Sequence, residues 1–208
     1  MTLSPLYTIV DREVAQGFGW SVPGLAKAYL AGGSSVLQIR VQEATSSELL
    51  SWCGTVVVAA REYDASVIVN NRLDIAQLVG ANGVHLGQHD LTVNTARQLL
   101  GSQAMVGLST HNLQEIESSA TEMISYVAVG PVFNTDTKDT KCAAVGLDLV
   151  SAAAAQKPWR PVVAIGGITL ERAPAVLEAG ASAVAVISDL LFGGDPERRV
   201  REYLDVLA

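Results

Sequence analysis

The chain has 208 residues, of which 49% are hydrophobic and 17% are charged, and its 14 Lys and Arg residues against 21 Asp and Glu residues give a formal net charge of −7. So many apolar residues exclude intrinsic disorder, and the acidic balance excludes a broad basic surface for nucleic acid. We therefore expect no nucleic-acid partner. No stretch reaches the roughly 18 continuous apolar residues of a membrane-spanning helix, so we expect no membrane partner either.

Short β-branched runs alternate with longer Ala- and Leu-rich segments along the whole chain. Most of the runs lack polar–apolar alternation, which is typical of strands buried on both faces of a parallel sheet. In chain order the predicted strands are Leu6–Val10, Val36–Arg40, Val67–Asn70, Gly83–Leu86, Met105–Ser109, Tyr126–Gly130, Val162–Gly166 and Ala183–Ser188. The predicted helices are Val22–Ala31, Ser46–Tyr63, Leu73–Val79, Val93–Leu100, Leu113–Ala120, Leu147–Ala155, Leu170–Ala179 and Pro196–Leu207.

Helix boundary signals agree with this division, since a capping box occupies Thr45–Glu48 and glycines such as Gly80 and Gly101 follow helices. Eight strand–helix units in 208 residues average 26 residues each, which is compact for a (β/α)₈ barrel of the usual ~250 residues. A doubly wound open sheet is the competing architecture, but it normally has fewer strands at this length. Because no linker or low-complexity tract divides the chain, we predict an α/β fold, a single (β/α)8 TIM barrel domain spanning residues 1–208.

Polar residues gather where predicted strands end, and in a barrel the carboxyl ends of the strands carry the chemistry. These polar ends are Gln38–Gln42, Asn70–Arg72, Gly87–Asp90, Ser109–His111, Gly130–Lys138, Ile165–Ile168 and Ile187–Asp189. Seven of them in succession predict a functional site on this face.

Arg40 lies at the mouth of an otherwise apolar strand. A planar guanidinium group matches the geometry of phosphate, so we predict that Arg40 binds an anion. The alternative is a structural ion pair, for which Glu13, Glu43 and Asp90 are available.

Two further features predict phosphate binding. Lys138 lies beside Thr135 and Thr137, which favours an anion ligand over a solvated surface lysine. The pair Gly166–Gly167 follows an apolar strand, so its backbone N–H groups are able to approach a phosphate together with Ile187–Ser188. Barrels often bind phosphate in the loops after their last two strands.

Asp90 is the best candidate for a metal ligand. Its carboxylate, with the amides of Asn70 and Asn71 and with substrate oxygens, suits Mg²⁺. The alternative is that Asp90 caps the helix beginning near Val93, and the two roles are compatible.

The remaining titratable groups give a weaker signal. His85 lies inside a predicted strand and is interpreted as a hydrogen-bonded core residue. His111 lies just past a strand end, where it is suited either to acid–base chemistry or to hydrogen bonding at the start of the next helix. Cys53 and Cys142 lack the neighbours of an activated thiolate and form no metal-ligand spacing. Reduced thiols, together with the absence of a signal-like segment at residues 1–13, predict a cytoplasmic location.

In this order the motifs resemble the thiamine phosphate synthase family, whose sister group is the thiazole tautomerases. The matching segments are Gln38–Arg40, Val69–Arg72, Gly83–Asp90, Gly107–His111, Gly130–Phe133, Thr135, Thr137, Lys138, Ile165–Ile168 and Val186–Ser188. The resemblance implies a barrel that couples 4-amino-2-methyl-5-hydroxymethylpyrimidine diphosphate to a thiazole phosphate or its carboxylate. It also implies a need for Mg²⁺ and a dissociative mechanism, in which pyrophosphate leaves first and the thiazole nitrogen captures the pyrimidine carbocation.

The resemblance also implies residue roles. Small phosphorylated substrates are the expected partners, a homo-oligomer is one expected state, and Arg40, Ser109, Lys138 and His111 are the implied catalytic residues. The pyrimidine diphosphate would contact Gln38, Ile39, Arg40, Val41, Gln42, Asn70, Ser109 and Lys138. Mg²⁺ would lie at Asn71 and Asp90, and the thiazole phosphate would meet Thr135, Asp136, Thr137, Gly167, Ile187 and Ser188.

Two positions depart from the family pattern, because Gln42 stands where Lys is usual and Asn71 where Asp is usual. The first removes a cation from the diphosphate site, and the second replaces a carboxylate metal ligand by a weaker amide. Two alternatives therefore stay open: a thiazole tautomerase that uses His111 as acid or base, and a non-catalytic barrel that binds thiazole phosphate. Asp90 and residues 135–138 favour the synthase, and the polar segment 134–145 is the predicted lid.

Overall fold

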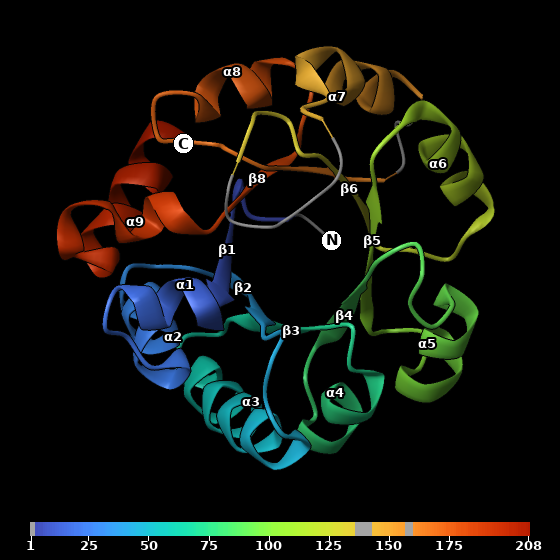
Figure 1. Ribbon diagram of the computed structural model, residues 1–208. Coiled ribbons are helices and arrows are strands. Elements are labelled where there is room, and N and C mark those ends of the chain that lie inside the picture. Colours follow the sequence, from blue (N-terminus) through green and yellow to red (C-terminus); the bar gives the residue numbers. More distant parts are fainter. Residues whose placement is uncertain (1–2, 136–142, 157–159) are drawn as a thin grey trace.

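The computed structural model describes residues 3–135, 143–156 and 160–208. Within these ranges, parallel strands β1 to β8 pair in chain order, and β8 pairs with β1 to close the barrel (Figure 1). The predicted (β/α)₈ barrel is therefore confirmed. The competing open sheet is excluded, because an open sheet would leave two unpaired edges.

The strands occupy the positions predicted from the β-branched runs, with ends that differ by at most two residues. They are β1 (Leu6–Asp11), β2 (Val36–Arg40), β3 (Ser66–Asn70), β4 (Gly83–Leu86), β5 (Met105–Thr110), β6 (Tyr126–Val129), β7 (Val162–Ile165) and β8 (Ala183–Val186). The largest difference is at β8, which ends before Ile187 because the chain turns there into the 3₁₀ helix η2 (Ser188–Gly194).

Helices surround the barrel and cover its outer face (Figure 1). They are α1 (Arg12–Gly17), α2 (Val22–Ala31), α3 (Ser46–Arg61), α4 (Leu73–Val79), α5 (Val93–Leu100), α6 (Leu113–Ser118), η1 (Ser119–Thr121), α7 (Gly146–Ala155), α8 (Ala173–Glu178) and α9 (Pro196–Val206). None of the helices in the described part of the chain is long and apolar enough to cross a membrane.

Helices α2, α4 and α5 have the predicted bounds, whereas α1 and η2 were not predicted and α8 begins three residues later than predicted. The late start of α8 follows from a turn in which the Thr169 carbonyl accepts from the amides of Arg172 and Ala173. Pro174 then occupies the first turn of the helix, where a missing N–H costs nothing. The predicted capping box is confirmed, since Thr45 and Glu48 bond each other's backbone at 3.2 and 2.9 Å.

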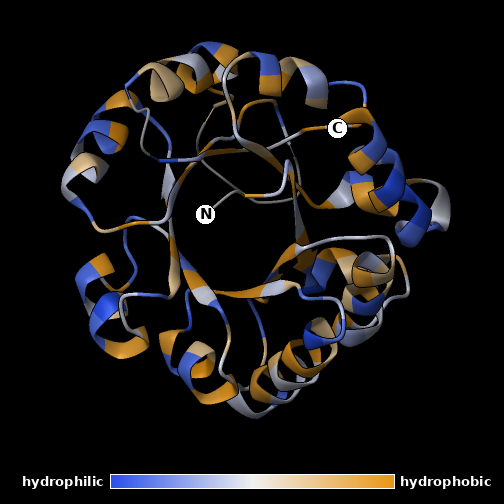
Figure 2. Cartoon of the chain, turned by 180° about the vertical axis from the view of Figure 1, so that it is seen from behind, coloured by the Kyte–Doolittle hydropathy of each residue, from blue (hydrophilic) through white to orange (hydrophobic). Residues whose placement is uncertain are grey.

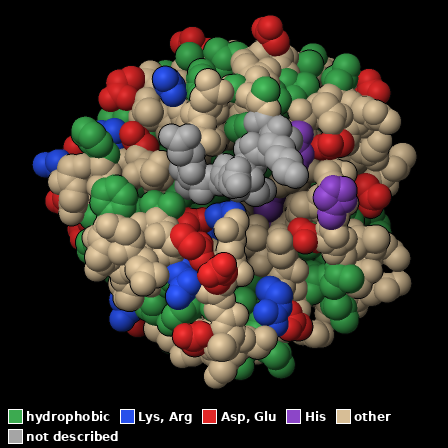
Figure 3. All heavy atoms as spheres, in the orientation of Figure 1, with side chains coloured by type: hydrophobic (Ala, Val, Ile, Leu, Met, Phe, Trp, Pro, Cys, Tyr) green, Lys and Arg blue, Asp and Glu red, His purple; other side chains and the backbone are tan. Residues whose placement is uncertain are grey.

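Alternation along the strands divides the core into two layers. On β2, Leu37 and Ile39 pack outward with the helices, whereas Gln38 and Arg40 face the barrel interior. A second apolar cluster, which includes Ile9, fills the inside of the barrel. Seen from behind, the strands are mostly hydrophobic, and the helices carry both hydrophobic and polar residues (Figure 2). Along the barrel axis, histidine, acidic and basic side chains gather around the centre of one face (Figure 3).

Candidate functional site

A cavity of about 1000 Å³ lies inside the barrel at the carboxyl ends of the strands, and each of β1 to β8 contributes to its wall. Many of the positions predicted from strand ends meet in this wall. They are Gln38, Arg40, Asn70, Ser109, His111, Thr135, Gly167, Ile187 and Ser188. The prediction that the polar strand ends share one face is therefore confirmed for these residues, since Gln38 and Ser188 line the same cavity although they are 150 positions apart in the chain.

Other sequence-predicted residues lie elsewhere. The cavity wall in the described part of the chain does not include Ile39, Val41, Gln42, Asn71 or Asp90. The side chain of Ile39 is buried in the outer apolar layer. Asp136, Thr137 and Lys138, most of the predicted lid and Cys142 lie outside the described residues. The roles assigned to all these residues stay predictions.

Arg40 is held by a buried ion pair with Asp11. Both side chains are at least nine-tenths buried, and the other oxygen of Asp11 accepts from the amide of Val14 to cap α1. None of the three acidic residues expected as partners is the one used, because parallel pairing of β1 with β2 sets Asp11 directly opposite Arg40. Since Arg40 also lines the cavity, the ion pair orients its guanidinium group without removing it from the site.

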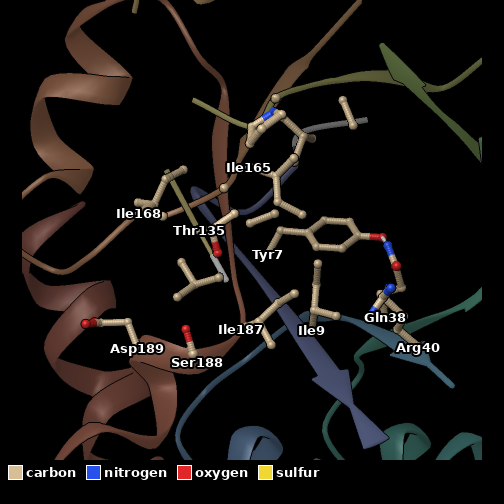
Figure 4. Close-up of a pocket in the computed structure, with 18 of the residues that line it drawn as sticks. Tyr7, Ile9, Gln38, Arg40, Thr135, Ile165, Ile168, Ile187, Ser188 and Asp189 are labelled. Carbon is tan, nitrogen blue, oxygen red and sulfur yellow. Dashed lines mark hydrogen bonds between the residues drawn. The ribbon is translucent and has the colours of Figure 1, made fainter. Parts of the chain in front are cut away.

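A chain of hydrogen-bonded side chains crosses the barrel interior and forms part of the cavity wall. Gln38 Nε2 donates to the Tyr7 hydroxyl at 3.1 Å, and the Tyr7 and Tyr126 hydroxyl oxygens are 2.8 Å apart. His85 continues the chain, with Nδ1 3.0 Å from the Tyr126 oxygen and Nε2 2.8 Å from Ser109 Oγ. Figure 4 shows the Tyr7 hydroxyl pointing at the end of the Gln38 side chain. Two predicted site residues, Gln38 and Ser109, are thus the ends of one network.

The tyrosines of this network are neutral at ordinary pH. Burial raises the pKa of Tyr7 to about 12 and raises the pKa of Tyr126 well above its usual value of about 10. Space for the Tyr126 ring comes from Gly107 on the next strand, because a Cβ there would lie 2.1 Å from the ring. The interpretation of His85 as a hydrogen-bonded core residue is confirmed, and the residue also forms part of the cavity wall.

His111 lies at the cavity mouth and faces an acidic partner. Its Nδ1 is 3.1 Å from Glu115 Oε2, and the same oxygen accepts from the His111 amide at 2.8 Å. Asn112 caps α6 by accepting from the Glu115 amide at 2.9 Å. The helix-start hydrogen bonding considered as an alternative is therefore present, while the ring still lines the cavity.

The two residues predicted to hold a metal follow the neighbouring strands β3 and β4. Asn71 has a positive φ of 61°, and its backbone N–H donates to the His85 carbonyl at 2.8 Å. Asp90 Oδ2 accepts from the Gly87 amide at 2.6 Å. The alternative role of Asp90, as the cap of the following helix, is wrong, because Thr92 caps α5 by accepting from the Thr95 backbone N–H. Within the described ranges no group of three or more His, Cys, Asp or Glu residues is placed to hold a metal ion.

The opposite end of the cavity is built from the loops after β7 and β8. Gly167 has a φ of 60°, and a Cβ there would lie 2.5 Å from the Asn134 carbonyl, so only glycine fits. Ser188 and Asp189 face this end from η2. In Figure 4, Gln38 and Arg40 lie on one side, Ser188 and Asp189 lie on the other, and Ile9 and Ile187 lie between them.

Asp189 ties three segments together through one oxygen. Its Oδ2 accepts from the Leu170 amide at 3.2 Å and from the Tyr203 hydroxyl at 2.6 Å, and it lies 2.8 Å from Arg199 Nη2. The carboxylate thus joins the loop after β7, η2 and α9. Sequence reasoning placed Asp189 at a polar strand end but gave it no role, and it missed Asp11. The signal for Asp11 was present, because Asp11 directly follows an apolar run as the other strand-end residues do.

This geometry suits two small molecules bound side by side. Each end of the cavity offers polar groups for an anion, and the apolar middle offers surface for flat rings. Buried Cys53 has no part in such chemistry, since burial raises its pKa to about 12 and keeps the thiol protonated.

Comparison with known proteins agrees with the resemblance found in the motifs. The family model for thiamine monophosphate synthase matches residues 6–190. A thiamine-phosphate synthase from Koribacter versatilis is 38% identical, and the alignment covers 100% of this chain and 97% of that protein. One from Synechococcus sp. WH7803 is 43% identical over 87% of this chain and 51% of its own, so the chain spans about half the length of that relative.

The same family appears among solved structures. The structure of a thiamine phosphate pyrophosphorylase from Pyrococcus furiosus matches with a TM-score of 0.85 at 30% identity, covering 97% of this chain and 94% of that one. Sequence motifs, barrel and full-length relatives therefore agree, and the chain belongs to the thiamine monophosphate synthase family.

Proposed function

We propose that this chain is a thiamine-phosphate synthase, which couples 4-amino-2-methyl-5-hydroxymethylpyrimidine diphosphate to 4-methyl-5-(2-phosphoethyl)thiazole, or to its carboxylate, with release of pyrophosphate. The observation that carries the proposal is the match of a full-length relative, at 38% identity, to a chain whose cavity has two polar ends and an apolar middle. Such a cavity fits two ring-containing phosphorylated molecules.

The diphosphate end is assigned to the side of β2, β3 and β5. Arg40 supplies a guanidinium group whose position is fixed by Asp11, and Asn70 and Ser109 supply polar groups nearby. A cation that is already oriented stabilises the charge that builds up on the departing pyrophosphate without reorganising first. Lys138 completes this end in the proposal on the strength of its sequence motif alone.

Mg²⁺ is part of the proposal, and the residues fit it by their chemistry. Asn71 and Asp90 follow the adjacent strands β3 and β4 and offer an amide oxygen and a carboxylate. Mg²⁺ prefers oxygen ligands and is often held by one or two carboxylates together with substrate phosphates. When bound, it would neutralise charge on the diphosphate leaving group.

The hydrogen-bonded network positions groups before the substrates arrive. Because the Tyr7 hydroxyl accepts from Gln38 and His85 contacts Ser109, the Gln38 amide and the Ser109 hydroxyl each have one fixed partner. In a dissociative coupling there is little proton transfer for the protein to perform, so positioning carries most of the catalysis. The thiazole phosphate is assigned to the other end, with Thr135, Gly167 and Ser188.

The two alternatives are less favoured. A tautomerase would use His111 as acid or base, and a non-catalytic barrel would bind thiazole phosphate only. Curated relatives that match over most of their length are named thiamine-phosphate synthases, which supports the coupling reaction. A cytoplasmic location and a homo-oligomeric state belong to the proposal as well and await fractionation and solution-mass measurements.

The test supplies both substrates with Mg²⁺ and assays thiamine phosphate and pyrophosphate. We expect equal amounts of both products, and none when either substrate is omitted or when Mg²⁺ is chelated. Turnover of the thiazole carboxylate without metal, lost in His111→Ala, would instead identify a tautomerase. Binding of thiazole phosphate without either reaction would identify a binding protein.

A further inference from the structure

Arg172 is a second guanidinium group in the cavity wall, to which neither the motifs nor the family resemblance assigns a role. It directly precedes α8, on the side of the cavity where Gly167 and Ser188 lie. Its Nη1 donates to the Gly167 carbonyl at 2.8 Å, and its guanidinium carbon lies 4.7 Å from the centre of the Phe133 ring. A hydrogen bond and a stacked ring together hold an otherwise flexible side chain beside Gly167.

Arg172 differs from Arg40, the other arginine in the described wall, in its electrostatic partners. Arg40 forms its ion pair with buried Asp11, whereas Arg172 forms no ion pair within 4 Å among the described residues. The nearby carboxylate of Asp189 pairs with Arg199 at 2.8 Å, and Arg199 also pairs with Glu202 at 3.0 Å. The carboxylate of Glu171 interacts electrostatically with Arg172 but forms no described ion pair with it. The Arg172 guanidinium group is therefore bonded to a neutral carbonyl, and its remaining N–H groups are available to an anion.

A local cation matters in this chain because its net charge is −7. The field of the whole protein repels a phosphate dianion, so a phosphate site has to be made attractive by groups at the site itself. Gly166 and Gly167 allow close approach of the backbone but contribute no formal charge. Arg172 is the side chain in the described wall that supplies it there.

We propose that Arg172 determines the specificity for the second substrate. Its guanidinium group binds the phosphate of the phosphorylated thiazole, and this contact selects the phosphorylated thiazole over the unphosphorylated thiazole alcohol. This inference rests on the proposed function for the identity of that substrate. The guanidinium fork presents two parallel N–H groups to a phosphate, and Phe133 sets the plane of the fork.

The experiment compares wild type with Arg172→Gln, which keeps a donor for the Gly167 carbonyl and removes the charge. Calorimetric titration measures the dissociation constants of thiazole phosphate and of thiazole alcohol, and steady-state coupling gives KM for both substrates. We expect thiazole phosphate to bind about tenfold more weakly or worse. The affinity for the alcohol and KM for the pyrimidine diphosphate should stay within twofold. Arg61→Gln, at an exposed position near the end of α3, is the matched control and should change none of these values.

The outcomes separate this inference from the proposed function. Equal affinity of wild type and Arg172→Gln for thiazole phosphate, or equal loss for phosphate and alcohol, would overturn the role of Arg172 even if coupling is observed. Coupling that fails while the phosphate-dependent loss persists would overturn the synthase and retain the anion site. A wild-type protein that binds no thiazole phosphate would overturn both.

Discussion

The hydroxyl oxygens of Tyr7 and Tyr126 lie 2.8 Å apart inside the barrel, although 119 positions separate the two residues in the chain. Their rings are tilted by 58° with centres 5.6 Å apart. Because β1 and β6 are not neighbours in the sheet, this contact spans the interior and links the two halves of the barrel.

Removing the Tyr7 hydroxyl should destabilise the protein. Tyr7→Phe leaves Gln38 Nε2 without its buried partner and removes one of the two partners of the Tyr126 hydroxyl, which keeps His85 Nδ1. This change costs about 1–3 kcal/mol in the free energy of unfolding. Urea denaturation measures the loss, and Tyr63→Phe at an exposed position should be neutral. In a double-mutant cycle, Tyr7→Phe and Tyr126→Phe should be non-additive by at least about 0.5 kcal/mol. Strict additivity would contradict the contact.

Stability should fall in strongly alkaline solution because of the same residue. The pKa of Tyr7 is about 12 in the folded state against about 10 when unfolded. The unfolded state therefore loses the proton first, and the contribution that is complete below pH 10 disappears as the pH rises toward 12. Denaturation at pH 9 and pH 11 should show a smaller decrease for Tyr7→Phe than for wild type. An identical decrease would mean that Tyr7 is not buried.

Asp11→Asn should be among the most damaging single substitutions. It leaves the Arg40 guanidinium buried without its carboxylate, at a cost of about 3–5 kcal/mol in the free energy of unfolding. Asparagine still caps α1, so the loss reports on the ion pair. Asp205→Asn on the surface is the control, and adding Arg40→Gln should recover part of the loss. A single variant as stable as wild type would show that the pair contributes nothing.

Removing the hydroxyl group of two buried tyrosines should have different effects on the free energy of unfolding. The Tyr29 hydroxyl has no hydrogen-bond partner among the described residues, whereas the Tyr203 hydroxyl donates to Asp189 at 2.6 Å. Tyr29→Phe should therefore leave the free energy of unfolding unchanged or raise it by about 1 kcal/mol. Tyr203→Phe should lower it by about 1–3 kcal/mol. Thermal and urea denaturation of the pair distinguishes them, and the reverse order would show that the assigned partners are wrong.

Restoring the usual family residues at positions 42 and 71 should raise the rate of the proposed reaction. Asn71→Asp with Gln42→Lys would place a carboxylate at the proposed metal site and a cation at the proposed diphosphate site. Asp also tolerates the positive φ of position 71. We expect half-maximal coupling at about tenfold lower Mg²⁺ concentration and a higher rate. A fall or no change would count against the assignment of these positions.

The architecture was predictable because β-branched runs without alternation are characteristic of a parallel sheet, and eight of them close a ring. The elements that were missed are α1, which follows β1 with no intervening loop, and η2, in which Gly193 has a φ of 76°. Six residues are too few for helical periodicity to show, and 3₁₀ geometry follows a different period.

The site was predictable only in part. Strand ends identified positions such as Arg40 and Ser109, but not which side chain each would contact. In a strand that is apolar throughout, nothing in the pattern tells which face points inward, so the link between Tyr7 and Tyr126 was hidden. The acidic residues considered for an ion pair with Arg40 did not include Asp11, which is the partner that the structure shows. The pairing of β1 with β2 decides it, and register is not readable from the residues alone.

The triple contact of Asp189 ties the last helix, α9, to the cavity wall. Tyr203 and Arg199 lie in α9, yet both bond the carboxylate that shapes the wall beside the glycines. Trimming the C-terminus ahead of residue 199 would therefore withdraw two supports from a rim some thirty positions upstream (Ile168 to Arg199). A tag or fusion joined at this tail needs a spacer, since tension on α9 would reach the cavity wall at Asp189.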